Sequence, residues 1–205
     1  MIKNIVLDIG MVLGHFCWEK VFTDIMNVTG EDFDRLAKVT VLGPYWDEFD
    51  RGVLTDEEIA KKCIALSPSD EPLIREFYSH LGEIVEDFDY SYDWVKNLKA
   101  AGFGVYLLSN YGKTAFKKCR ANGNLAFVDL VDGAFISYEY KMIKPDIEIY
   151  KTFLRTYDLN GEECLFIDDR PVNVQGSIDA GMGAYLFENY EDTVSYIESV
   201  TGKKL

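Results

Sequence analysis

Residues 2–8 read Ile-Lys-Asn-Ile-Val-Leu-Asp, a short apolar run that ends on a carboxylate. The length of this run and its β-branched side chains predict a buried strand. Further apolar runs of strand length follow at residues 105–108, 134–136 and 164–167, with a weaker one at residues 184–187. The chain is therefore expected to contribute five strands.

Helical patterns separate these runs, at residues 113–121, 147–157, 172–180 and 192–200. Another helical segment at residues 93–101, stopped by Gly102, precedes the second run. Strands that alternate with helices predict a parallel sheet covered by helices on both faces. We therefore expect an α/β fold with a Rossmann-like parallel sheet.

The first two expected strands are separated by residues 8–104, far more chain than one crossover helix requires. Most of this segment has a helical pattern. Residues 55–58 match a capping box that opens a helix through Leu66, and residues 70–81 form another helical segment. We predict a helical cap at residues 15–86, inserted into a Rossmann-like core made of residues 1–14 and 87–205.

The 205 residues include 35 Asp and Glu against 21 Lys and Arg, which gives a net charge of −14 at pH 7. Because this charge repels phosphate backbones and anionic lipids, nucleic acid and membranes are poor partners. A small anionic substrate is compatible if local positive groups or a cation reverse the field in one pocket. The cysteines are widely spaced and no apolar run approaches the ~20 residues of a membrane span, so we expect a cytoplasmic protein.

Polar residues follow the expected strands at the points where the strands end. Asp8 follows the first strand, Ser109-Asn110 the second and Asp168-Asp169 the fourth, while Lys144 precedes the helix after the third. Ligands of open parallel sheets bind beyond the carboxyl ends of the strands. Each motif alone is equally consistent with a chain turn or a helix cap. Their joint occurrence at one sheet edge favours a functional site.

Carboxylates that meet at one edge require a compensating positive charge. A like-charge pair at about 4 Å costs on the order of 4 kcal/mol at an effective dielectric of 20. Lys144 can neutralise one carboxylate, and an all-oxygen site that is otherwise open to water and substrate suits Mg²⁺. Such a cation would also attract a phosphate group.

The sequence resembles the haloacid dehalogenase superfamily in four ordered motifs and in a helical cap inserted after the first. The motifs are residues 7–13, residues 108–110, residues 144–146, and residues 166–169 with Asn173. Residues 51–55 in the cap and Gly181-Met182 extend the resemblance over nearly the whole chain. Within the superfamily, the sequence looks most similar to the bacterial group of alpha-D-glucose-1-phosphate phosphatases.

The resemblance implies that Asp8 is a nucleophile that forms an aspartyl-phosphate, which water then hydrolyses. It also implies Mg²⁺ held by Asp8, the Gly10 carbonyl and Asp169. Asp168 and Asn173 would complete this metal site by ordering its waters. The transferring phosphoryl group of a small phosphorylated metabolite would be gripped by Ser109, Asn110 and Lys144.

Gly10 departs from the commonest pattern of the family, which has an aspartate there to protonate the leaving oxygen. An acid of this kind typically contributes ~10² to 10⁴ in rate. Its absence implies a slow enzyme, an acid borrowed from the cap or the substrate, or a leaving group that needs little protonation. The anomeric oxygen of a sugar 1-phosphate is such a leaving group, and the group named above also has Gly at this position.

Two further residues are candidate substrate contacts. His15 lies soon after the first motif and is the obvious stand-in acid, with a hinge residue bonded to backbone as the alternative. Arg51 precedes Gly52 in the cap and is expected either to reach the substrate or to lie in solvent. Trp46 and Trp18 are expected to line the pocket or to pack within the cap.

The leading interpretation is a Mg-dependent phosphatase acting on small phosphate monoesters, with sugar 1-phosphates favoured. A haloacid dehalogenase would need no metal, which leaves the Asp168-Asp169 pair without a purpose. A phosphoglucomutase must move protons reversibly, which Gly10 disfavours. A non-catalytic protein that binds phosphorylated ligands is the alternative from another class.

Overall fold

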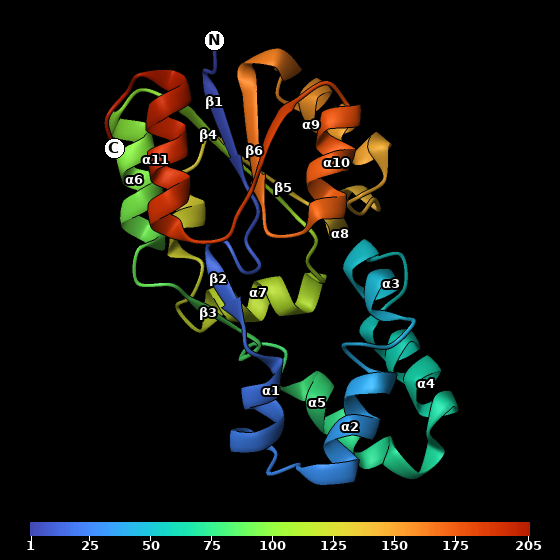
Figure 1. Cartoon of the computed structure of the whole chain (residues 1–205). Coiled ribbons are helices and arrows are strands. Elements are labelled where there is room, and N and C mark those ends of the chain that lie inside the picture. Colours follow the sequence, from blue (N-terminus) through green and yellow to red (C-terminus); the bar gives the residue numbers. More distant parts are fainter.

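Five parallel strands form the central sheet, in the order β5-β4-β1-β6-β7 (Figure 1). The computed structural model describes residues 1–205. The strands are β1 Asn4–Leu7, β4 Gly104–Ser109, β5 Gly133–Ile136, β6 Cys164–Asp168 and β7 Gly183–Leu186. The expected α/β fold with a parallel sheet is confirmed, and the strand ends differ from the expected ones by no more than two residues.

Alternate residues of the central strand pack on opposite faces of the sheet. Ile5 and Leu7 join the larger apolar core with Trp94, whereas Val6 joins the smaller core with Phe153. Both sets of side chains are fully buried. This two-sided burial explains why the strand is a continuous apolar run in the sequence.

Helices cover both faces of the sheet, with α6 and α11 on one side and α9 and α10 on the other (Figure 1). This part of the chain contains α6 Ser91–Ala100, α7 Lys113–Ala121, η3 Ala126–Asp129, α8 Ser137–Tyr140, α9 Ile147–Thr156, η4 Gly161–Glu163, α10 Pro171–Asp179 and α11 Tyr190–Thr201. No helix combines the length and the apolar character that crossing a membrane requires.

The segment between β1 and β4 leaves the sheet through an antiparallel ribbon of β2 Gly14–Phe16 and β3 Val85–Asp87. Between these two strands the chain is helical, and Figure 1 shows this part below the sheet. It contains α1 Trp18–Lys20, the π-helical turn η1 Val21–Ile25, α2 Gly30–Val39, α3 Trp46–Arg51, α4 Asp56–Leu66, η2 Pro68–Asp70 and α5 Glu71–Ser79. We call residues 15–86 the inserted segment.

The capping box at the start of α4 is present. The Thr55 amide donates to Glu58 Oε2 at 2.8 Å, and the Glu58 amide donates to Thr55 Oγ1 at 3.3 Å. These two bonds satisfy amides that the first helical turn leaves free. The capping-box motif therefore predicted the start of α4 correctly.

Helix α3 is the part of the inserted segment that contacts α8 beside the sheet. The Ser137 hydroxyl donates to the Asp50 carbonyl at 2.6 Å, and Lys141 Nζ donates to the Gly52 carbonyl. The Phe49 ring packs against Gly112 so closely that a Cβ at Gly112 would lie 2.1 Å from Phe49 Cε1. The inserted segment is therefore closed over the carboxyl ends of the strands.

Candidate active site

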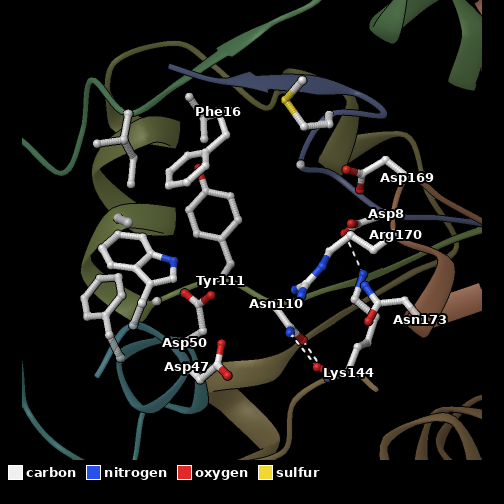
Figure 2. A pocket seen from close by; sticks show the side chains of 18 residues that line it. Asp8, Phe16, Asp47, Asp50, Asn110, Tyr111, Lys144, Asp169, Arg170 and Asn173 are labelled. Carbon is white, nitrogen blue, oxygen red and sulfur yellow. Dashed lines mark hydrogen bonds and ion pairs between the residues drawn. The ribbon is translucent and has the colours of Figure 1, made fainter. Parts of the chain in front are cut away.

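A cavity of about 240 Å³ lies between the carboxyl ends of the strands and helix α3 (Figure 2). The sheet side contributes Asp8, Lys144 and Asp169, and α3 contributes Trp46 and Asp50. Elements far apart in the sequence thus supply opposite walls of one cavity that is partly open to solvent. The position matches the place where open parallel sheets bind ligands.

Asp8 is the first residue after β1, at the edge where β4 and β6 also end. Leu7 lies opposite Leu107 on one side and Ile167 on the other, so the strand ends are in register. Asp8 is 7% exposed, and its Oδ1 accepts a hydrogen bond of 2.8 Å from the Ile9 amide. The carboxylate is thereby held at the floor of the cavity.

Lys144 is buried between two carboxylates. Its Nζ lies 2.8 Å from Asp8 Oδ1 and 2.6 Å from Asp168 Oδ2. Burial lowers the pKa of Lys144, but the charges of Asp168 and Asp8 outweigh this effect and raise it. Lys144 therefore remains a cation and partly compensates two buried negative charges.

Burial raises the pKa of Asp8 to about 7, with Lys144 and the Ser109 hydroxyl acting in the opposite direction. Ser109 is the last residue of β4 and is 1% exposed. A second cation beside Asp8 would hold this carboxylate in its ionised form at neutral pH. The chemistry of the site thus favours a bound metal ion.

Asp168 has nearly all of its acceptor capacity engaged within the protein. Besides Lys144, Asn173 Nδ2 donates to both of its oxygens at 2.9 and 3.1 Å, and the Arg170 amide donates to Oδ1 at 2.8 Å. This carboxylate therefore orients Lys144 and Asn173. It has little remaining capacity to bind a cation directly.

Three carboxylates form an acidic cluster at the floor of the cavity. One oxygen from each of Asp8, Asp168 and Asp169 lies within 4.8 Å of the others. Burial and the neighbouring Asp168 raise the pKa of Asp169. Asn173 Oδ1 is buried and has no hydrogen-bond partner within the protein, although Asn173 lines the cavity. These residues fit a divalent cation with ordered waters, because both the charge and the unpaired oxygen call for one.

Asn110 fixes the loop that carries Lys144. Its Nδ2 donates to the Lys144 carbonyl at 3.0 Å, and its Oδ1 accepts from the Lys144 amide at 2.8 Å (Figure 2). Both ends of the Asn110 amide are therefore used for positioning. The segments after β4 and before α9 are tied together at the cavity edge.

The wall opposite Asp8 is aromatic and acidic. Phe16, Trp46, Phe49 and Tyr111 line it together with Asp47 and Asp50. Burial raises the pKa of Asp50 to about 8, and the charges of Asp47 and Asp8 raise it further against the Gly112 amide and Lys144. This wall therefore holds a carboxyl group that is largely protonated at neutral pH.

The structure does not bring His15 or Arg51 into the cavity lining. His15 is exposed on β2, where its ring stacks on Phe88. Arg51 pairs with Glu48 at 3.4 Å and with Asp146 at 3.5 Å, at the contact between α3 and the start of α9. The expectation that these two residues contact the substrate therefore has no support from their placement.

Asp50 and Arg170 are among the cavity residues that the sequence did not indicate as part of the site. Asp50 lies next to the Arg51-Gly52 motif, but nothing in the sequence indicates which side of α3 faces the sheet. Arg170 follows Asp168-Asp169 directly, and Figure 2 shows its side chain extending across the cavity. The position of Arg170 directly after these carboxylates could have indicated a contact with phosphate. Of the two tryptophans considered, Trp46 lines the cavity, and Trp18 packs on Phe22 and Phe33 in the inserted segment.

The fold and the site are those of a recognised class of hydrolases. Residues 21–181 match the family model of the haloacid dehalogenase-like hydrolases. The chain belongs to this family, as its four motifs and the inserted helical segment suggested.

Among similar proteins, D-ribitol-5-phosphate phosphatase of Bacteroides thetaiotaomicron is 26% identical over 197 residues, which cover 94% of this chain and 95% of that protein. Flavin mononucleotide hydrolase 1 of Arabidopsis thaliana is 29% identical over 153 residues, or 70% of this chain. The matched part spans only 57% of that plant protein.

A crystal structure of a haloacid dehalogenase family enzyme from Bacteroides thetaiotaomicron, in complex with magnesium and inorganic phosphate, has a TM-score of 0.74 to this chain. The two are 22% identical, and the match covers 94% of this chain and 99% of that one. At this identity the likeness establishes the shared fold.

Proposed function

We propose that the protein is a Mg-dependent phosphatase that hydrolyses small phosphate monoesters. The observation that carries this proposal is the buried Asp8-Lys144-Asp168 arrangement, with Asp169 beside it, at the floor of the cavity. A carboxylate nucleophile, a fixed ammonium group and a set of oxygen ligands are what phosphoryl transfer to a side chain requires. The names of the phosphatase relatives support the same activity.

In this mechanism Asp8 attacks the phosphorus and takes the phosphoryl group, and water later releases phosphate. Lys144 and the Ser109 hydroxyl stabilise the phosphoryl oxygens, and Arg170 contributes positive charge from the side. Asp8, the Gly10 carbonyl and Asp169 would hold Mg²⁺, which would supply positive charge to offset the negative oxygens. Asp168 keeps Lys144 and Asn173 in place.

We further propose sugar phosphates as the substrate class, with sugar 1-phosphates favoured. The cavity volume of about 240 Å³ suits a small leaving group, and its aromatic side chains can pack on the apolar face of a sugar ring. Gly10 supplies no acid from the core, so an anomeric leaving oxygen, which needs less protonation, depends least on a proton donor from another wall and is favoured. In this account residues 15–86 are the cap and residues 1–14 and 87–205 the catalytic core.

The arrangement of the site does not favour the alternative function of a haloacid dehalogenase. A carboxylate that attacks carbon needs no cation, yet Asp8 lies within 4.8 Å of two further carboxylates. Burial, with a further contribution from Asp168, raises the pKa of Asp8 to about 7, which would weaken the nucleophile if no cation were bound. The site is therefore better suited to phosphorus chemistry with a metal.

A phosphate-release screen tests the proposal. Sugar phosphates, nucleotides and phospho-acids are each incubated with the protein, with and without Mg²⁺, and Asp8→Asn serves as the blank. We expect Mg-dependent release from sugar phosphates by the parent protein alone. Identical behaviour of parent and blank on every compound would establish the binding-only alternative. Equal turnover of glucose 1-phosphate and glucose 6-phosphate would remove the preference for anomeric leaving groups.

A further inference from the structure

We propose that Asp50, on helix α3 of the inserted segment, is the general acid that protonates the leaving oxygen in place of the acid absent at Gly10. This inference rests on the proposed phosphatase function. It assigns a catalytic role to a residue outside the four motifs of the core.

The sheet side of the cavity has no carboxyl group free for this task. Asp168 is engaged by Lys144, Asn173 and the Arg170 amide, and Asp8 is the nucleophile. Asp169 belongs to the metal site, and no other carboxyl of the cavity lining comes from the core. The proton must therefore come from another wall.

The other candidate donors are directed elsewhere. The Tyr111 hydroxyl donates to Cys119 Sγ at 3.2 Å, away from the substrate space. His15 is exposed on β2 and does not line the cavity. Asp47 lines the cavity beside Asp50, but it is exposed to water. Asp50 is the remaining carboxyl group that is both buried and directed into the cavity.

In-line displacement places the leaving oxygen on the side of phosphorus opposite the attacking oxygen. Because Asp8 lies at the floor of the cavity, the leaving oxygen points toward α3. Figure 2 shows Asp50 on the wall across the cavity from Asp8. The carboxyl group of Asp50 is therefore on the side where a proton is needed.

Asp50 is held firmly at this position. It is 9% exposed, and its own carbonyl accepts the Ser137 hydroxyl at 2.6 Å. The neighbouring Phe49 packs on Gly112, which anchors the same turn of α3 to the core. A buried acid fixed by contacts with the core can reach the reacting atoms reproducibly whenever α3 is docked.

The environment of Asp50 suits a proton donor. Burial raises its pKa to about 8, so the carboxyl group is largely protonated at neutral pH. The titratable groups that face it are Asp47 on its own helix, Tyr78 on α5, and Asp8, Tyr111 and Lys144 from the core. Lys144 carries a positive charge, but it is already paired with Asp8 and Asp168. Arg170 of the core also lines the cavity and is the other positive group of the lining.

The two chemical steps balance with this assignment. In the first step a bond forms between Asp8 and phosphorus, and the bond from phosphorus to the leaving oxygen breaks with its electron pair. The leaving oxygen takes the Asp50 proton and departs as an alcohol. In the second step water attacks phosphorus and gives a proton to the Asp50 carboxylate, and the bond to Asp8 breaks to release phosphate. Asp50 returns to its starting form.

The test compares Asp50→Asn with the parent on two substrates in Mg²⁺. Glucose 6-phosphate has an alcohol leaving group that needs a proton, and p-nitrophenyl phosphate has a phenolate that leaves without one. We expect kcat/KM to fall by about 10² to 10⁴ on glucose 6-phosphate and by less than about tenfold on the aryl ester. Equal losses on both substrates by a folded variant would overturn the assignment.

Asp47→Asn tests the other carboxyl group of this wall. The control is Glu48→Gln, which neutralises a carboxylate of the same helix that does not line the cavity. We expect it to change both substrates by the same small factor. A selective loss on glucose 6-phosphate in Asp47→Asn but not in Asp50→Asn would assign the acid to Asp47 instead.

The parent protein provides a readout that does not depend on the folding of a variant. Its kcat/KM should fall above about pH 8 on glucose 6-phosphate, because the acid must be protonated, but not on the aryl ester. The same alkaline limb on both substrates would contradict a role for Asp50 in leaving-group protonation. Absence of Mg-dependent release from either ester by the parent would instead overturn the proposed function itself.

Discussion

The two walls of the cavity place their carboxyl groups in opposite electrostatic environments. On the sheet side, Lys144 Nζ lies within 2.8 Å of both Asp8 and Asp168, and backbone amides complete the pairing. On α3, Asp50 is buried beside Asp47 with no cation of its own. The carboxyl groups of the floor are thus suited to act as carboxylates, and the carboxyl group of the opposite wall is suited to donate a proton.

The largest effect is expected at the floor. Asp8→Asn removes the nucleophile while keeping its shape, so turnover of every phosphate ester should fall on the order of 10⁴-fold or more. Steady-state phosphate release measures the loss, and an unchanged thermal unfolding transition confirms the fold. A variant that keeps a tenth of the parent rate would show that Asp8 is not the reacting group.

The second effect concerns the compensation of charge by Lys144. Lys144→Met leaves Asp8 and Asp168 buried without their cation, so we expect a free energy of unfolding lower by about 3–5 kcal/mol. Turnover should fall by about 10² to 10³ as well, since a preorganised positive group is lost. Urea denaturation and phosphate release provide the two measurements.

The loss of folding stability in Lys144→Met should depend on pH. Without Lys144 the folded-state pKa of Asp8 rises above its value of about 7, so the folded variant holds a proton at neutral pH that the unfolded chain releases. The stability deficit of Lys144→Met should therefore shrink as the pH falls from the alkaline range toward about 7. The control is Lys141→Met, which removes an exposed ammonium group that bonds the Gly52 carbonyl. An equal, pH-independent loss in both variants would contradict the account of the buried pair.

A smaller effect is expected when an acid is added to the floor. A Cβ at Gly10 meets no atom within 4 Å, so Gly10→Asp should be accommodated without strain. In the Asp50→Asn background it should restore turnover of glucose 6-phosphate by at least about tenfold, with little change on glucose 1-phosphate. Gly10→Asn is the matched control. A uniform change across leaving groups would contradict our interpretation of the missing acid.

The smallest effect is expected at the anchor of α3. Ser137→Ala leaves the Asp50 carbonyl and the Tyr111 amide without their hydroxyl partner, which costs about 1–3 kcal/mol of stability. Turnover should fall only a few-fold, and more on glucose 6-phosphate than on an aryl ester. A Ser137→Thr variant, which keeps the hydroxyl, should behave more like the parent. Full parent activity of Ser137→Ala on both substrates would show that this anchor does not position Asp50.

Much of the floor was predictable because it depends on strand ends. The continuous apolar run at residues 5–7 marks a strand buried on both faces, and parallel strands end at one edge. Asp8, Ser109, Lys144 and Asp168 could therefore be placed near one another from their sequence positions. The resemblance then supplied roles that spacing alone could not.

The α3 wall was not predictable in the same way. The orientation of α3 depends on Phe49 packing against Gly112 and on the Ser137 bond, which are tertiary contacts between distant segments. The strands of the β2-β3 ribbon are three residues each, too short for a period of two to be recognised. His15 lies outside the cavity lining, and proximity to Asp8 in sequence does not determine which side of that ribbon a residue occupies.

The central claim is that Asp8 carries the phosphoryl group during turnover. The direct test is rapid acid quenching of the parent protein during hydrolysis of glucose 6-phosphate in Mg²⁺, followed by peptide mapping by mass spectrometry. We predict one phosphoryl group on Asp8 of the parent, in the peptide that contains residues 4–20. In the Asp50→Asn variant, any phosphoryl group that is detected should also be on Asp8. A phosphoryl group on another residue, or turnover with no covalent phosphate at any quench time, would contradict it.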